Sequence, residues 1–164
     1  MPEVCMLVKR DTERIRPVVV SRPVGPTNES NLRAYKVASG LITAAAAGNT
    51  ILFAWQNPEA NQIIVYEVVI NISVAGTVGA CAIDVGPVAN AAANSDTIID
   101  GLLLNAISCQ SSLDVTASVG VNADERPKVL DENGGATDWI TGYESAIVAT
   151  TNLVARYYIF YISV

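Results

Sequence analysis

The side chains that most often perform acid–base and nucleophilic chemistry are scarce in this chain. Its 164 residues include no histidine, which is the commonest general base and transition-metal ligand. Nucleophilic catalysis by a serine or cysteine paired with a histidine is therefore excluded. Cys5, Cys81 and Cys109 are widely spaced and form no C-x-x-C pair, so we expect neither a zinc site nor a redox pair. We interpret them as reduced, small apolar residues.

Carboxylates are the remaining candidates for chemistry. Seven aspartates fall at expected turns and strand ends: Asp84, Asp96, Asp100, Asp114, Asp124, Asp131 and Asp138. Paired carboxylates can hydrolyse glycosides, and loop carboxylates can hold calcium. The scatter pairs none of them, and the D-x-D-x-D-G calcium signature is absent. Residues 76–79 lack the G-K-[ST] ending of a phosphate loop. We interpret the aspartates as turn caps and predict no enzyme, cofactor or metal site.

Charge divides the chain unevenly. Residues 1–36 hold seven basic and four acidic residues, a net charge of +3, whereas the rest holds three basic and twelve acidic residues, a net charge of −9. Two interpretations stay open: ordinary solubility charge, or an arm that binds an acidic neighbour such as another copy's body. The candidate contacts of such an arm are Arg10, Arg14, Arg16 and Arg22. The basic residues are few and alternate with acids, so we expect no nucleic-acid binding.

Residues 1–34 are expected to be an extended N-terminal arm. Pro17, Pro23 and Pro26 fall within a short stretch, and proline blocks helix and removes backbone donors. This segment has too little apolar surface to fold alone and would become ordered on another surface. Residues 35–164 are expected to form one domain.

Within that domain, apolar and polar residues alternate with the period of two that is typical of strands. The clearest run places Ile64, Tyr66, Val68, Ile70, Ile72 and Val74 on one face, expected in the core. Similar runs cover residues 51–56, 81–85 and 113–121, and short strands are expected at 139–141 and 146–148. Residues 97–104 are expected as a helical turn entering a strand, and 122–137 as a hairpin or loop. The fold class predicted is all-β: an antiparallel β-sandwich (jelly roll) with an extended N-terminal arm.

The C-terminal segment, residues 154–164, is apolar or aromatic on both alternate sets of positions. A strand of this kind is expected to be covered on both faces. Its second face is covered either by a neighbouring subunit or by the arm or a loop of the same chain. If a neighbour covers it, the candidate contact residues are Tyr157, Ile159 and Tyr161.

Membrane insertion and secretion are not expected. No apolar run approaches the roughly 20 residues of a membrane helix, and residues 1–5 lack a basic segment followed by an apolar one. We therefore expect synthesis in a host cytoplasm.

Several runs of the domain give it a resemblance to a known family. These are 53–58 (FAWQNP), 64–70 (IVYEVVI), 81–86 (CAIDVG), 96–101 (DTIIDG) and 153–161 (LVARYYIFY). In this order they resemble jelly-roll virion structural proteins of tailed bacteriophages, including capsid decoration (cement) proteins. The likeness covers about residues 40–164. It implies a homotrimer or similar cluster on the capsid exterior, bound to the major capsid protein, with arms that cross capsomer boundaries.

The predicted function is therefore that of a structural virion protein of the capsid decoration type, which stabilises a phage head by oligomerising and docking on the major capsid protein. The physical argument is that this chain has more apolar strand surface than one sandwich can bury. The alternative is a receptor- or glycan-binding module of a phage tail or fibre, which would carry aromatic side chains on exposed loops.

Overall fold

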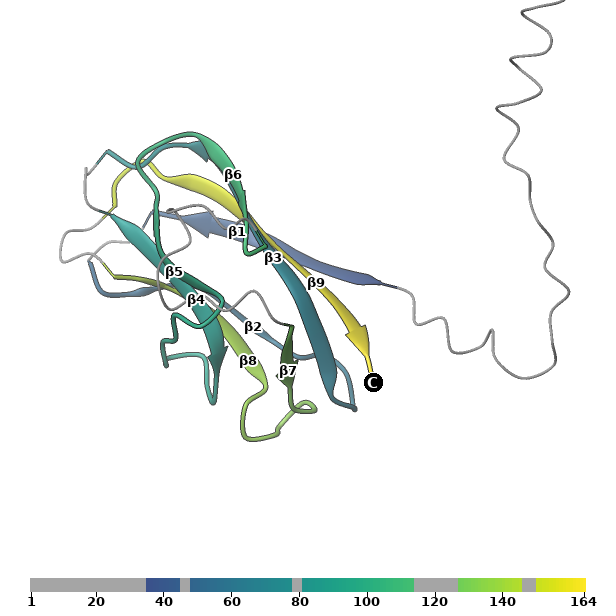
Figure 1. Cartoon of the computed structure of the whole chain (residues 1–164). Helices are drawn as coiled ribbons and strands as arrows, with labels where there is room; N and C mark the ends of the chain where they lie inside the picture. The colour runs from purple at the N-terminus through teal and green to yellow at the C-terminus, as the bar shows by residue number, and fades with distance from the viewer. Residues whose placement is uncertain (1–34, 45–47, 78–80, 114–126, 146–149) are drawn as a thin grey trace, which may run out of the picture. The chain divides into compact units, whose positions relative to one another are not determined.

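The computed structural model describes residues 35–44, 48–77, 81–113, 127–145 and 150–164. In this part of the chain there are strands and no helix, and two antiparallel sheets pack against each other, which confirms the all-β sandwich (Figure 1). Its jelly-roll connectivity stays a prediction. The arm expected at 1–34 and the short strand expected at 146–148 lie outside the described residues, as does most of the strand expected at 113–121. No helix of the described residues is long and apolar enough to span a membrane.

The strands divide into two sheets. The first has the order β1 (Lys36–Thr43), β9 (Val154–Ser163), β3 (Ile63–Val74) and β6 (Ser108–Ser111), with β7 (Lys128–Leu130) also paired to β3. The second has the order β2 (Ile51–Gln56), β8 (Trp139–Glu144), β4 (Ala82–Val88) and β5 (Ile99–Leu103). We call them the five-stranded and the four-stranded sheet.

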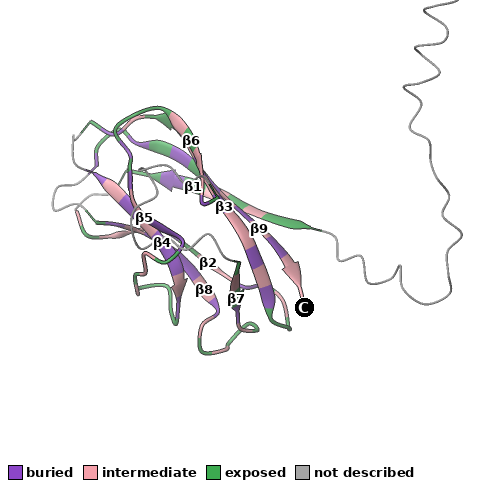
Figure 2. Cartoon of the chain, viewed as in Figure 1, coloured by how far each residue is buried: buried purple, intermediate pink, exposed green. Residues whose placement is uncertain are grey.

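The core lies between the two sheets. Buried and more exposed residues alternate along β3, β4 and β9, as expected for strands with one face inward (Figure 2). The strand predicted from the run 81–85 is β4, and Cys81, Ile83 and Val85 of this run are each fully buried. Ile70 and Ile159 meet them from the five-stranded sheet and are also fully buried.

The inward face predicted for β3 is correct for only part of the strand. A β-bulge interrupts the pairing with β9 between Val65 and Glu67, so the alternation changes parity there. Ile63 and Val65 point inward before the bulge, and Val68, Ile70 and Ile72 point inward after it. Ile64 and Tyr66, predicted to lie in the core, are only half-buried, and Val74 is exposed.

Three other segments differ from expectation. Residues 99–103 form strand β5 without a preceding helical turn, and the Ile98 N–H already bonds to the Val85 carbonyl of β4. Strand β7 lies inside the segment 122–137 that was expected to be a hairpin or loop. Strand β8 continues through Gly142 to Glu144, past the end of the short strand expected at 139–141.

Candidate docking surface on the five-stranded sheet

The inner face of β9 packs against the four-stranded sheet. Tyr157, Ile159 and Tyr161 have exposed fractions of 9%, 0% and 6%. Phe53 stacks on Tyr157 with ring centroids 4.2 Å apart, and Trp55 lies 5.3 Å from Tyr161. The prediction that these three β9 residues contact a partner is therefore wrong, because they are part of the core. Both alternate sets of β9 are apolar, so periodicity alone could not separate the inner face from the outer one.

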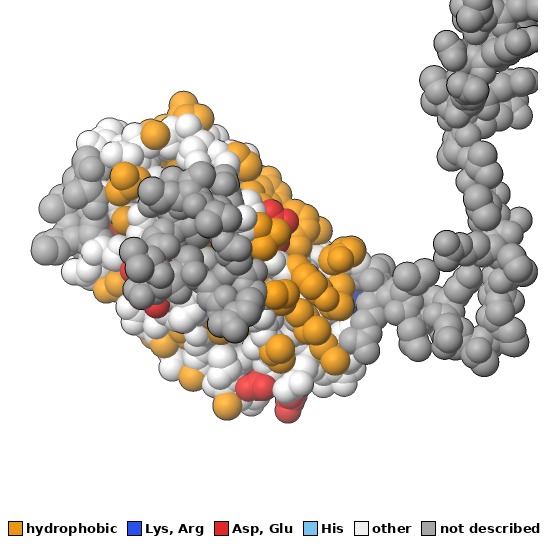
Figure 3. Space-filling model, viewed as in Figure 1, with side chains coloured by type: hydrophobic (Ala, Val, Ile, Leu, Met, Phe, Trp, Pro, Cys, Tyr) orange, Lys and Arg blue, Asp and Glu red, His pale blue; other side chains and the backbone are white. Residues whose placement is uncertain are grey.

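The other alternate set of β9 lies on the outer face of the five-stranded sheet. The register places Val37 of β1 beside Phe160, and Val69 of β3 beside Tyr158. We define the apolar outer face by ten residues: Tyr35, Val37, Leu41, Ile64, Tyr66, Val69, Val129, Tyr158, Phe160 and Ile162. In Figure 3, hydrophobic side chains gather over β1, β3 and β9, on the right of the view.

This outer face exposes much of its apolar surface. Tyr35, Val37, Leu41 and Val129 have exposed fractions of 70%, 54%, 55% and 55%. Tyr35 packs edge-on against Tyr66, with ring centroids 5.7 Å apart. The outer face of an antiparallel sandwich is usually polar, and contiguous exposed apolar patches mark interaction sites. The arrangement is suited to contact with another protein surface.

Two charged side chains interrupt the apolar outer face within its strands. Glu67 lies beside Phe160 and accepts a hydrogen bond from the Ser111 hydroxyl. Arg156 is exposed, lies beside Asn71, and has no ion-pair partner within the described part of the chain. Glu67 and Asn71 are four residues apart on β3, so the two charges are separated by about 13 Å along the strands. Midway between them lies the Val69–Tyr158 pair.

A polar contact fixes the start of β1. The Lys36 ammonium lies 2.6 Å from the Glu59 carboxylate and donates to the Ser163 hydroxyl at the end of β9. The hydrogen bond with Glu59 raises the pKa of Lys36 above its ordinary value. The Tyr161 hydroxyl also donates to Glu59, at 3.5 Å. This contact holds the residue at which the segment 1–34 joins the domain, although Arg10, Arg14, Arg16 and Arg22 of that segment lie outside the described residues.

Sequence reasoning missed the outer-face set of β9, but the sequence contains a signal for it. Arg156 has the same parity as Tyr158, Phe160 and Ile162, and an unpaired charge is rarely buried. The position of Arg156 therefore marks its alternate set as the one that faces away from the core.

The aspartates described in the structure act within turns and between strands. Asp84 accepts the Gly101 N–H at 2.8 Å, and partial burial raises its pKa despite that bond, with a further contribution from the charge of Asp100. Asp138 accepts from the Gln56 amide and the Gly134 N–H, both at 2.7 Å, and the bond from Gln56 is the main reason that its pKa is lowered. Among the described residues, no three acidic or cysteine side chains are arranged to hold a metal ion.

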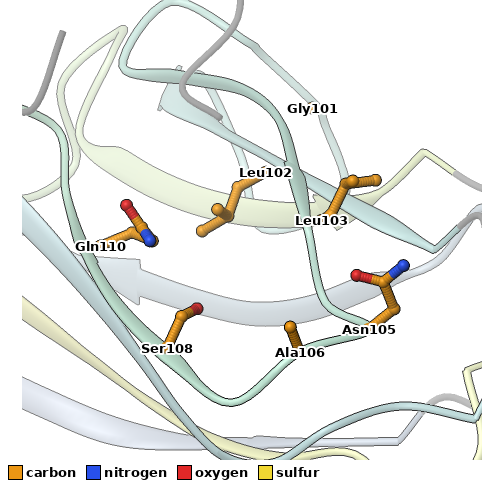
Figure 4. A pocket seen from close by; sticks show the side chains of 7 residues that line it. All are labelled: Gly101, Leu102, Leu103, Asn105, Ala106, Ser108 and Gln110. Carbon is orange, nitrogen blue, oxygen red and sulfur yellow. The ribbon is translucent and has the colours of Figure 1, made fainter. Parts of the chain in front are cut away.

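An open hollow of about 570 Å³ lies between β5 and β6 (Figure 4). Its lining is Gly101, Leu102, Leu103, Asn105, Ala106, Ser108 and Gln110. Leu102 and Leu103 come from β5, and the polar side chains of Ser108 and Gln110 come from β6. The lining contains no aromatic and no charged residue, so the hollow offers no stacking platform and no acid–base pair.

Comparison with known proteins adds no assignment to this geometry. A scan against protein-family models and a search of curated proteins both returned no match.

Proposed function

We propose that this protein is a structural virion protein of the capsid decoration type. It associates with further copies of itself and docks on the major capsid protein on the outside of a phage head. The resemblance of residues 40–164 to decoration proteins gives the class and implies a trimer or similar cluster. The domain supplies a rigid body, and the segment 1–34 supplies a second contact with the shell.

The observation that carries the proposal is the apolar outer face of the five-stranded sheet. Ten apolar residues share this face with Glu67 and Arg156. Permanent protein interfaces are more hydrophobic than transient ones, so a surface of this composition is suited to a lasting contact. The chain thus has excess apolar strand surface in its described part, as the sequence argument requires.

The proposed role explains why such a surface is retained. A decoration protein adds contact area at the seams of a shell that is under internal pressure, and many symmetric copies multiply modest individual affinities. An antiparallel sandwich also resists proteolysis, because its strands are hydrogen-bonded and packed and seldom unfold locally.

The test is reconstitution on capsids assembled without this protein. We expect the purified full chain to cosediment with these particles at a saturating stoichiometry and to raise the temperature at which they release their genome. Phe160→Asp places a carboxylate in the apolar outer face and is expected to reduce binding strongly. Leu103→Asp, at an exposed position of the other sheet, is the matched control and is expected to bind normally. No binding of the folded full chain to any particle would refute the proposal.

A receptor- or glycan-binding module of a tail or fibre is the second candidate. The hollow beside Asn105, Ser108 and Gln110 is the feature that would serve it. Sugar sites usually stack their ligand on aromatic side chains, and its lining has none, so it supports this function less well than the apolar outer face supports the first. Binding of the full chain to host cells, abolished by Gln110→Ala and retained by Phe160→Asp, would favour this candidate.

A further inference from the structure

We propose that the apolar outer face is covered by the same face of a second copy, around a two-fold axis that places Glu67 of each copy over Arg156 of the other. This inference concerns the protein without any particle, so it stands or falls separately from the proposed role on a capsid.

The positions of the two charges carry the argument. A two-fold interface uses the same patch on both subunits, so each residue must find its complement within that patch. Glu67 and Arg156 have opposite charge and lie on either side of the Val69–Tyr158 pair. An axis that runs across the strands at the level of this pair exchanges the two ends of the face. Each Glu67 carboxylate then faces one Arg156 guanidinium, and this contact occurs twice in the complete interface.

Side-chain reach agrees with this pairing. Sheets packed face to face lie about 10 Å apart, and the lateral offset between neighbouring strands is about 4.8 Å. A glutamate and an arginine extended toward each other span such a gap. Near the axis, Val69 and Tyr158 of the two copies would pack together as the apolar centre of the contact.

Charge balance also favours a second copy as the occupant. The chain carries a net charge of −6, so two copies repel each other over most of their surface. Within the strands of the apolar outer face, by contrast, one acid and one base cancel. The face is thus a place at which identical acidic molecules can meet without a net penalty. A two-fold pair departs from the trimer that the family resemblance implies.

The test is the oligomeric state of the full chain, measured by size-exclusion chromatography with light scattering over a dilution series. The wild type is expected to be a two-copy species that dissociates on dilution. Glu67→Arg and Arg156→Glu should each raise the dissociation constant more than about tenfold, because each creates two like-charge contacts. The double variant should return it to within about threefold of the wild type. Glu67→Gln keeps an oxygen for the Ser111 hydroxyl and should have an intermediate effect.

Glu132→Arg is the control, because it changes the net charge as Glu67→Arg does but lies in an exposed loop outside this face. Far-ultraviolet circular dichroism and the unfolding midpoint verify that each variant is folded.

Cys109 gives a second readout, because it lies beside Asn71 and is exposed in the single copy. Its alkylation, followed by peptide mass mapping, should be slower in the wild type than in Arg156→Glu.

Three results would overturn the inference. One is a monomeric full chain at tens of micromolar, which would indicate that another segment covers the face. Another is a mass of three copies, and the third is a double variant that dissociates as readily as the single ones.

Discussion

Phe53 and Tyr157 stack across the core at an interplanar angle of 18°, and each ring lies over the glycine that pairs with it on the neighbouring strand of its own sheet. A Cβ at Gly142 would lie 2.1 Å from the Phe53 ring, and a Cβ at Gly40 would lie 2.6 Å from the Tyr157 ring. The two glycines therefore make room for this stacked pair between the sheets. Neither glycine has a positive φ, so glycine is needed at these positions because it lacks a side chain and not because of its backbone conformation.

Gly142→Ala is expected to destabilise the domain by about 2–3 kcal/mol, because the new methyl group overlaps the Phe53 ring and the core must shift. Urea unfolding followed by tryptophan fluorescence measures the change. Ala54→Ser, which adds one atom at an exposed position of β2, should change the stability by less than about 0.5 kcal/mol. Phe53→Leu should cost less in the Gly142→Ala background than in the wild type; fully additive effects would contradict this account.

The Glu144 carboxylate is expected to stabilise the fold by accepting the two hydrogen bonds from Thr150. Its carboxyl group is fully buried; one oxygen accepts both the Thr150 N–H and the Thr150 hydroxyl, while the other has no partner among the described residues. Glu144→Ala should cost about 2–4 kcal/mol, because it leaves two buried donors unsatisfied. Glu144→Gln keeps an acceptor oxygen and should cost clearly less in the same denaturant titration. Equal losses for both variants would show that the bonds to Thr150 contribute little.

The free energy of unfolding is expected to fall as pH rises through the pKa of Asp84. Partial burial raises the pKa of its carboxyl group, so the folded state holds the proton more tightly than the unfolded state does. Its contribution is complete below the ordinary pKa of aspartate and is lost as pH rises through the raised value. Asp84→Asn, whose amide oxygen can still accept from Gly101, should gain stability relative to the wild type between pH 3 and 7. The gain should be below about 1 kcal/mol because the side chain is partly exposed.

Asp138 should show the opposite pH dependence. The hydrogen bonds from Gln56 and Gly134 lower its pKa, so its contribution is complete above the ordinary aspartate pKa and is lost as pH falls through the lowered value. Asp138→Asn should be less stable than the wild type at pH 7, and the difference should shrink toward pH 2. Paired unfolding curves at the two pH values measure this, and a constant difference would show that charge is not the cause.

The sequence predicts the fold class well, because strand periodicity is a local property. The alternation of Cys81, Ile83 and Val85 identified strand β4, and the C-terminal strand was found in almost its full length. The failures have non-local causes. Strand β1 was not among the strands named from the sequence, because it contains Ser39 and Gly40, which are poor strand formers. The glycine at position 40 is explained only by the Tyr157 ring that packs on it.

The candidate site was predicted in kind but not in detail. Excess apolar strand surface is visible in the composition of residues 154–164, whereas its location depends on which alternate set meets the second sheet. Tyr157 is in the core because Phe53, about a hundred positions earlier, stacks on it. Periodicity within one strand contains no information on such a partner. The arginines proposed for the arm lie outside the described residues and stay predictions.

The bulge in β3 determines where a carboxylate can lie. Ile63 and Val65 point inward, and an uninterrupted strand would continue that parity through position 67. The glutamate would then enter the hydrocarbon interior that faces the four-stranded sheet, where a lone ionised group is prohibitively costly. The single extra residue at position 66 turns the side chain of Glu67 outward instead. Deletion of Tyr66 should therefore remove the bulge and still leave Glu67 outward and Val68 inward, because the remaining residues would alternate regularly.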